Sequence, residues 1–169
     1  MRLAGLLLGA AFAAALPALA AAEEPTGCGG FKWPLEKVRA ALLASQKPDV
    51  ANGGALALNT ASVLGLAPLA AAGLPHPPER PPKSPDSYAG HFTLAKPATP
   101  GIYKITMSSY AWIDVMDGGK FLSPTGFSGA AGCEGARKSV KFDLPARPLD
   151  LQISGVSDSK LSLIVSPSD

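Results

Sequence analysis

The sequence predicts a mainly β protein, an antiparallel β-sandwich or jelly-roll with one short N-terminal helix. After residue 87, short segments alternate apolar with polar residues, which is the pattern of strands with one buried face. Proline and glycine stand between these segments, where turns are needed. Seven or eight such strands suit two sheets that bury each other's apolar faces, because one sheet with one helix would leave much apolar surface in water.

Residues 1–22 have the pattern of a signal peptide. Arg2 precedes an apolar run over residues 3–16, and small residues form two A-x-A cleavage sites that end at residues 20 and 22. The run is shorter than the about 20 residues of a membrane span, and two glutamates follow it, although an uncleaved anchor is the alternative. We expect cleavage within residues 20–22, a periplasmic or secreted protein, and no membrane span after cleavage.

Two cysteines, Cys28 and Cys133, remain after cleavage, and an even number in an exported chain predicts a disulfide. It would close a loop of about 100 residues, for which the chain-entropy model predicts a stabilisation of about 4.7 kcal/mol. It would also pin the N-terminal segment to a loop far along the chain. Free thiols or a metal pair are the alternatives, but no histidines stand nearby at zinc-ligand spacing.

Residues 23–86 are expected to form a helix, an apolar segment and a proline-rich strap, in one domain with a β-sandwich core over residues 87–169. Pro34 suits a first helical turn, and Leu35, Val38 and Leu42 recur at helical spacing up to residue 45. A strand is predicted over residues 55–60. Residues 75–83 lack many backbone donors because of their prolines, so they are predicted to be extended, as a strap across the domain, a spacer or a recognition segment.

Alternation then predicts the strands of the β-rich half. Residues 88–94 and 103–107 are expected to pair as a hairpin, and residues 112–116 and 120–122 as a second one, since Asp117-Gly118-Gly119 suits a tight reversal. Three further strands follow at 140–144, 149–153 and 161–165, with turns at Pro145 and Gly155, and residues 123–138 are expected to be the longest irregular loop. The predicted core consists of Phe92, Tyr103, Ile105, Ile113, Val115, Val140, Phe142, Leu151, Ile153, Leu161 and Leu163.

An aromatic surface with charged neighbours is the candidate binding site. It consists of Tyr110, Trp112, Asp114, Phe127, Arg137 and Lys138. Such a surface on a loop above a rigid scaffold suits a sugar ring or a peptide. The alternative is that Trp112 packs over the helix or beneath the strap, and that Asp114 faces outward from its strand and pairs with Lys120 or Lys104.

No catalytic, metal or cofactor site is expected. The net charge of +2 comes from scattered basic residues, which argues against nucleic-acid binding. No G-x-S-x-G motif occurs, and Asp117, which with Asp114 could form a carboxylate pair, stands where a turn favours aspartate. His76 and His91 are the only histidines, and their spacing does not direct them to one metal.

Three segments resemble the bacterial pre-peptidase C-terminal domains, which are secreted β-sandwiches. The segments are Tyr88-Ala89-Gly90-His91-Phe92, Gly101-Ile102-Tyr103-Lys104-Ile105 and Trp112-Ile113-Asp114-Val115, and residues 149–165 resemble the closing hairpin of those domains. The resemblance covers about half of the chain after residue 22. It implies an accessory or carbohydrate-contacting role and assigns no catalytic residue.

A wider pattern resembles a family of small exported proteobacterial proteins without established function. It runs from Cys28-Gly29-Gly30-Phe31-Lys32-Trp33-Pro34 through Ala111-Trp112-Ile113-Asp114-Val115 to Arg137-Lys138-Ser139-Val140. Some members carry the label homogentisate 1,2-dioxygenase, which implies an iron oxygenase and would require His76, His91 and a carboxylate here. We predict instead a non-catalytic protein that binds envelope glycan or a protein partner, with the oxygenase as the alternative.

Overall fold

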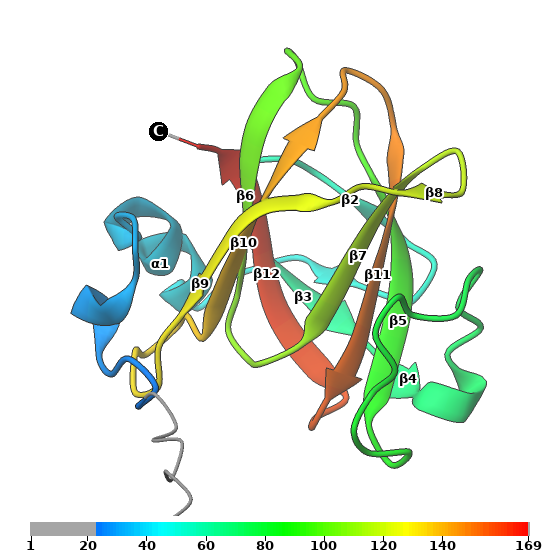
Figure 1. Ribbon diagram of the computed structural model, residues 1–169, viewed down its shortest axis with the longest axis horizontal. Coiled ribbons are helices and arrows are strands. Elements are labelled where there is room, and N and C mark those ends of the chain that lie inside the picture. The colour runs from blue at the N-terminus through cyan, green and yellow to red at the C-terminus, as the bar shows by residue number, and fades with distance from the viewer. Residues whose placement is uncertain (1–22, 169) are drawn as a thin grey trace, which may run out of the picture.

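The computed structural model describes residues 23–168, so the predicted signal peptide lies outside the described residues. Two six-stranded sheets face each other and enclose the core, and a short helix lies at one side (Figure 1). The β-sandwich predicted from alternation is therefore confirmed. In the part of the chain that the structure describes, no helix is both long enough and apolar enough to span a membrane.

The first sheet has the strand order β1-β3-β12-β6-β10-β9. Its strands are β1 (Asp49–Val50), β3 (Ser62–Gly65), β12 (Lys160–Pro167), β6 (Gly101–Met107), β10 (Lys138–Leu144) and β9 (Pro124–Gly129). All neighbours are antiparallel except β1 and β3. The prediction of an irregular loop over residues 123–138 was wrong for Pro124–Gly129, where β9 pairs with β10, and it holds for residues 130–137, which contain no named strand or helix. Proline and glycines interrupt the alternation of β9, and its register against β10 shifts between Lys141 and Phe142.

The second sheet has the order β2-β5-β11-β7-β8, with β4 also paired to β5. Its strands are β2 (Ala55–Leu56), β5 (Tyr88–Leu94), β11 (Leu149–Val156), β7 (Trp112–Asp117), β8 (Lys120–Phe121) and β4 (Ala67–Pro68). β2 runs parallel to β5, and the strand predicted over residues 55–60 is reduced to these two residues. Two short 3₁₀ helices, η1 (Cys28–Gly30) and η2 (Leu69–Ala71), complete the elements.

Two predicted hairpins were wrong, because the chain crosses between sheets where we expected it to turn back. β5 pairs with β11 whereas β6 pairs with β10 and β12, so the predicted 88–107 hairpin does not form. β11 and β12 also lie in different sheets, so residues 149–165 are not a closing hairpin. Gly155 lies within β11, where the register against β5 shifts, and its φ of 71° shows why glycine stands there.

The hairpin of β7 and β8 is confirmed. Met116 pairs with Phe121 and Asp117 with Lys120, so Gly118 and Gly119 form a two-residue turn. Their φ angles are 57° and 81°, which a tight turn of this hand requires and glycine adopts without strain. β8 pairs only with the end of β7, so the Trp112 end of β7 is an open edge of the second sheet.

The core prediction is confirmed in full, since every predicted residue belongs to the hydrophobic cluster between the two sheets. Leucines from short strands that alternation did not define, such as Leu64, complete this cluster. Full burial of such a side chain contributes roughly 1.5–3 kcal/mol. The core therefore fixes which face of each strand points outward.

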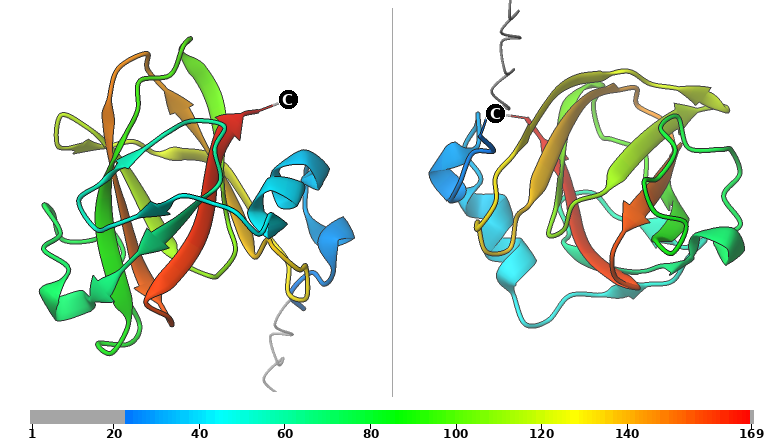
Figure 2. Two further views of the ribbon diagram at one scale, coloured as in Figure 1. Left: turned by 180° about the vertical axis from the view of Figure 1, so that it is seen from behind. Right: turned by 60° about the horizontal axis from the view of Figure 1, so that its bottom comes forward.

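The helix α1 (Glu36–Leu43) is shorter at both ends than the predicted segment of residues 34–45. Leu35, Val38 and Leu42 are buried in a second cluster with Ile164 of β12, as their spacing predicts. Figure 2 shows α1 and the N-terminal segment on the side of the molecule away from β4 and η2.

The predicted disulfide between Cys28 and Cys133 is present, with a Cα–Cα distance of 4.6 Å. It joins the N-terminal segment to the connection between β9 and β10. Backbone contacts reinforce the attachment, since Gly27 N donates to Ala131 O at 2.7 Å. The disulfide thereby keeps residues near Glu24 beside the first sheet.

The proline-rich strap, residues 75–83, crosses the outer face of β11 and β7. His76 N donates to Gln152 Oε1 at 3.0 Å, and Glu79 N donates to Asp114 Oδ2 at 3.2 Å. Gln152 and Asp114 are buried although they face away from the core. The strap therefore both covers these polar side chains and supplies their hydrogen bonds, which buried polar groups require.

Candidate functional site

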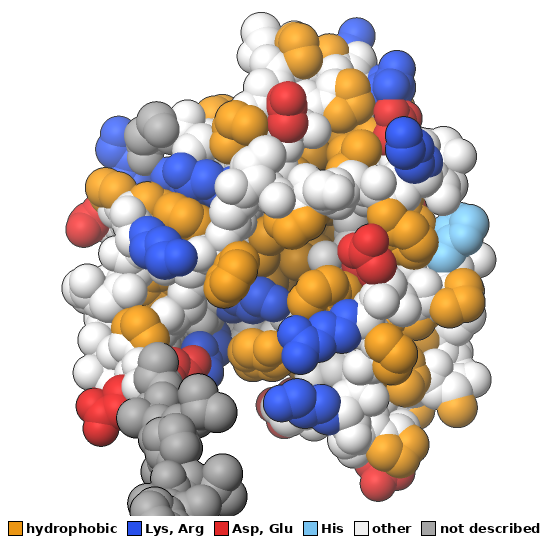
Figure 3. Space-filling model, in the orientation of Figure 1, with side chains coloured by type: hydrophobic (Ala, Val, Ile, Leu, Met, Phe, Trp, Pro, Cys, Tyr) orange, Lys and Arg blue, Asp and Glu red, His pale blue; other side chains and the backbone are white. Residues whose placement is uncertain are grey.

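A pocket of about 460 Å³ opens between the two sheets, where the free Trp112 end of β7 faces β9 and β10. Its interior is formed by Ile113, Leu122, Val140 and Phe142, which belong to the central core or pack against it. Figure 3 shows a hollow on this face, with hydrophobic side chains inside and Lys and Arg side chains along its lower rim. The pocket is thus an opening into the core, of a size in the roughly 300–1,000 Å³ range typical of small-molecule sites.

Three aromatic side chains form the rim. Tyr110 and Phe127 are 51% and 64% exposed, and Trp112 is half-buried. Trp112 is positioned by its ring nitrogen, since Nε1 donates to Asp114 Oδ1 at 2.6 Å. The ring lies beside the strap, with the Arg80 guanidinium 5.5 Å from its centroid. Trp112 therefore contacts the strap on one side and the pocket on the other, and it does not pack over the helix.

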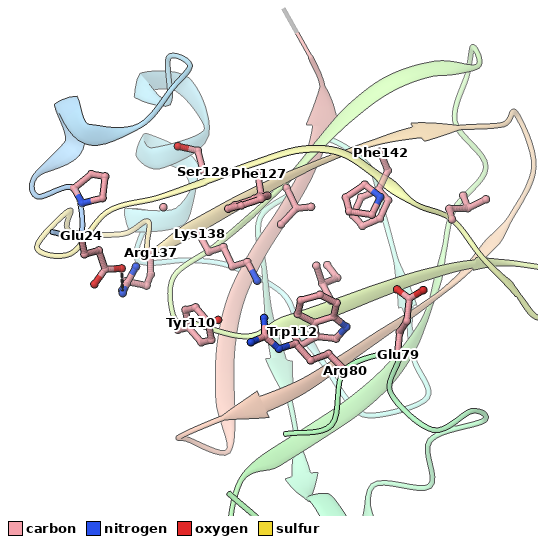
Figure 4. A pocket seen from close by; sticks show the side chains of 16 residues that line it. Glu24, Glu79, Arg80, Tyr110, Trp112, Phe127, Ser128, Arg137, Lys138 and Phe142 are labelled. Atoms are coloured by element: carbon pink, nitrogen blue, oxygen red, sulfur yellow. Dashed lines mark hydrogen bonds and ion pairs between the residues drawn. The ribbon is translucent and has the colours of Figure 1, made fainter. Parts of the chain in front are cut away.

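Three cations converge on the rings of Tyr110 and Trp112. Lys138 Nζ lies 4.9 Å from the centroid of Tyr110 and 5.3 Å from that of Trp112, and Arg137 lies 5.7 Å from Tyr110. Figure 4 shows the Lys138 side chain extending toward Trp112 and the Arg80 guanidinium beside the same ring. Cations at these distances are attracted to the faces of aromatic rings, which holds the charges at the pocket mouth.

Lys138 is partly buried at the pocket mouth, and its pKa is lowered there. Burial lowers the pKa of Lys138 to about 8, and repulsion from Arg80 and Arg137 adds to this. Nζ donates to Ala111 O at 2.7 Å. Among the described residues no carboxylate pairs with Lys138 or Arg80, whereas Arg137 forms an ion pair with Glu24. Two cations at the pocket mouth are therefore left without an ion-pair partner among the described side chains.

Asp114 does not line the pocket but supports it from the outer face of β7. Its carboxylate binds Trp112 Nε1 and the backbone of the strap, and burial raises its pKa despite these hydrogen bonds. The alternative pairing of Asp114 with Lys120 or Lys104 is wrong, because Asp114 is 3% exposed and its carboxylate accepts hydrogen bonds from the strap backbone and from Trp112. Asp117 instead binds Arg147, which lowers the pKa of that carboxyl.

The structure brings together five of the sequence-predicted site residues in the pocket lining: Tyr110, Trp112, Phe127, Arg137 and Lys138. Sequence reasoning missed Glu24, Glu79 and Arg80. Arg80 and Glu79 belong to the strap, and Glu24 is held near Arg137 by the neighbouring disulfide. The predicted disulfide was the one signal that could have placed Glu24; the strap gave no comparable signal.

Both histidines lie on the outer side of the second sheet, next to Gln152. His91 is the cross-strand neighbour of Gln152, and the His76 backbone binds the Gln152 amide. Their rings lie in different surroundings: His76 packs edge-on against Phe121 at 6.1 Å between ring centroids, and His91 lies beside Gly53. Residues 23–168 contain no group of three His, Cys, Asp or Glu side chains placed to hold a metal ion.

Comparisons with known proteins add no assignment. No family model, curated protein or solved structure matches this chain. The geometry of the pocket is therefore the basis for proposing a function.

Proposed function

We propose that this protein is an exported, non-catalytic binding protein and that its ligand enters the pocket between β7, β9 and β10. The observation that carries the proposal is the combination of a core-lined interior with an aromatic rim and a few charged groups. Concave apolar sites with a small number of polar groups are the usual form of ligand pockets. Export is supported by the signal-peptide pattern of residues 1–22 and by the disulfide.

The exposed aromatic rings support a binding role over a purely structural one. Phe127 and Tyr110 stand at the mouth with more than half of their surface in water. Each Å² of apolar surface left in water forgoes roughly 25 cal/mol, so a ligand that covers these rings gains binding free energy. The aromatic rim suits an envelope glycan or a protein ligand, and the interior favours a ligand with an apolar part that inserts between the sheets.

A neutral apolar probe tests this function. We expect N-phenyl-1-naphthylamine to bind saturably to the purified protein, with fluorescence enhancement as the measurement. Leu122→Trp replaces an aliphatic side chain of the pocket interior with a bulky indole ring and should abolish this enhancement. The matched control is Ile102→Trp on β6, an exposed position outside the pocket lining, which should leave binding unchanged.

Equal probe binding by the wild type and the Leu122→Trp variant would overturn the proposal, as would the absence of saturable binding. Circular dichroism of both variants checks that each retains the fold.

A further inference from the structure

We propose that the ligand is an anionic amphiphile, with a carboxylate or phosphate head group held by Lys138 and Arg80 and a single hydrocarbon chain inserted between the sheets. The inference rests on the proposed function, because it identifies the ligand class of the same pocket. It commits to one molecule per pocket.

The charges at the mouth favour an anion. Lys138 and Arg80 carry no ion-pair partner among the described residues, although both lie within 5.5 Å of the Trp112 ring centroid. The carboxylates nearby are otherwise placed: Glu24 binds Arg137, and Figure 4 shows Glu79 on the far side of Trp112 from Lys138. An anion between Lys138 and Arg80 would relieve the repulsion between the partly buried Lys138 and the exposed Arg80.

Both cations retain donors for a head group. Lys138 has three N–H donors and uses one for Ala111 O, so its remaining donors are available toward the mouth. The Arg80 guanidinium lies against the Trp112 ring face, and its planar fork suits a carboxylate or phosphate. Since Lys138 and Arg80 both lie near the Trp112 ring, an anionic head group beside this ring is within reach of both cations.

The interior favours a hydrocarbon chain over a sugar. Ile113, Leu122, Val140 and Phe142 offer no hydrogen-bonding side chain, and the one aliphatic hydroxyl of the described lining, that of Ser128, accepts from Lys32 N at 2.9 Å. A sugar that entered would lose its hydrogen bonds to water without replacement, whereas each buried CH₂ contributes about 0.8 kcal/mol. A glycan could contact the aromatic rim only.

Ligands with one chain and three head groups test the inference. Dodecanoate, dodecyltrimethylammonium and dodecyl maltoside are titrated, below the concentrations at which they form micelles, against protein carrying the neutral probe N-phenyl-1-naphthylamine. We expect the dissociation constant of dodecanoate, measured by displacement of the probe, to be at least tenfold lower than those of the other two ligands. Dodecyl phosphate should behave like dodecanoate.

Variants of Lys138 and Arg80 test whether these two cations cause the preference for an anionic head group. Lys138→Met and Arg80→Met should each weaken dodecanoate binding on the order of 10- to 100-fold and leave affinity for the neutral probe within about twofold. Arg80 lies in the exposed strap, so Arg80→Met tests the idea even if Lys138→Met perturbs folding. Lys160→Met, at an exposed cation that pairs with Asp49, is the control and should change neither affinity.

The pH dependence gives a separate readout. The groups facing Lys138 are Arg80 of the strap, the adjacent Arg137 with its partner Glu24, and Tyr110. An anion binds best while Lys138 is protonated, so dodecanoate affinity should fall as the pH rises from 7 to 9.5. Lys138→Met should flatten this profile.

The outcomes separate the two proposals. If the probe binds but all three head groups displace it equally, or if neither cation variant weakens dodecanoate binding, the amphiphile inference is wrong and the proposed function stands. If neither the probe nor any chain binds, the proposed function itself is wrong.

Discussion

The two tryptophans of the chain have similar partners but different surroundings. Trp33 Nε1 donates to Ser139 Oγ at 3.1 Å and has Lys141 Nζ 4.4 Å from its ring centroid; Trp112 Nε1 donates to Asp114 and has Lys138 at 5.3 Å. Trp33 packs against the cluster beneath α1, whereas Trp112 lines an opening into the central core. A lysine over an aromatic ring is therefore not sufficient to mark a site; access to an apolar interior makes the difference.

The regions around Trp33 and Trp112 also differ in how their covering segments are held. The disulfide fixes the N-terminal segment close to Trp33 and closes that side of the molecule with covalent help. The strap beside Trp112 is held by hydrogen bonds such as Glu79 N to Asp114 rather than by a covalent bond. We therefore expect the first region to contribute more to stability and the second more to binding.

The largest effect is expected on removal of the disulfide. Replacing both Cys28 and Cys133 by serine should lower the free energy of unfolding by about 2–5 kcal/mol, because the bond closes a long loop and so restricts the unfolded chain. Urea denaturation followed by circular dichroism measures the change, with reduced wild-type protein as the control. A loss below 1 kcal/mol would show that the region around Trp33 does not depend on the bond.

Substitution of each tryptophan by alanine should show that Trp33 contributes mainly to stability and Trp112 mainly to binding. Trp33→Ala should lower the free energy of unfolding by about 3 kcal/mol, the lower end for loss of a large aromatic side chain, because Trp33 is only partly buried, and it should leave binding of the neutral probe intact. Trp112→Ala should cost less and reduce probe binding at least tenfold. Thermal denaturation and probe titration of the same samples measure both. Similar results for the two variants would remove the distinction between the regions.

The smallest expected effect concerns the charge of Lys138. Its pKa is lowered to about 8 in the folded protein, so above this pH the unfolded chain binds more protons at this residue, and the contribution of Lys138 to the stability of the wild type rises toward pH 10. Lys138→Met lacks this rise, and its stability relative to the wild type should fall between pH 8 and 10 by up to about 1 kcal/mol, since solvent screens this half-exposed site. Denaturant titrations across this range measure the difference; parallel curves would contradict the lowered pKa.

The sequence predicted what depends on local alternation. Phe92, Ile105, Val115 and Leu163 each stand on the apolar side of a period-two pattern, and burial of that side follows from the pattern alone. The glycines of the β7–β8 turn likewise carried their own signal. Strand pairing could not be read in this way, because the partners of β6 are β10 and β12, both distant along the chain.

The candidate site was predictable in part for the same reason. Tyr110 and Trp112 are close in sequence, and Arg137 and Lys138 are adjacent. The two pairs line one pocket because β7 lies in the second sheet, β10 lies in the first, and the two sheets face each other. Arg80 stands in a proline-rich segment without periodicity. Its place over Trp112 depends on hydrogen bonds between the strap backbone and Asp114, and no local pattern encodes those.

The indole signals of the two tryptophans give the most direct test of the central claim, that the opening beside Trp112 is the binding site. The chain contains two tryptophans, so a ¹⁵N-labelled sample yields two indole N–H resonances, which Trp33→Phe assigns. On titration with dodecanoate or the neutral probe, we predict that the Trp112 resonance shifts saturably while the Trp33 resonance stays in place. A shift of Trp33 alone, or equal shifts of both, would contradict the account.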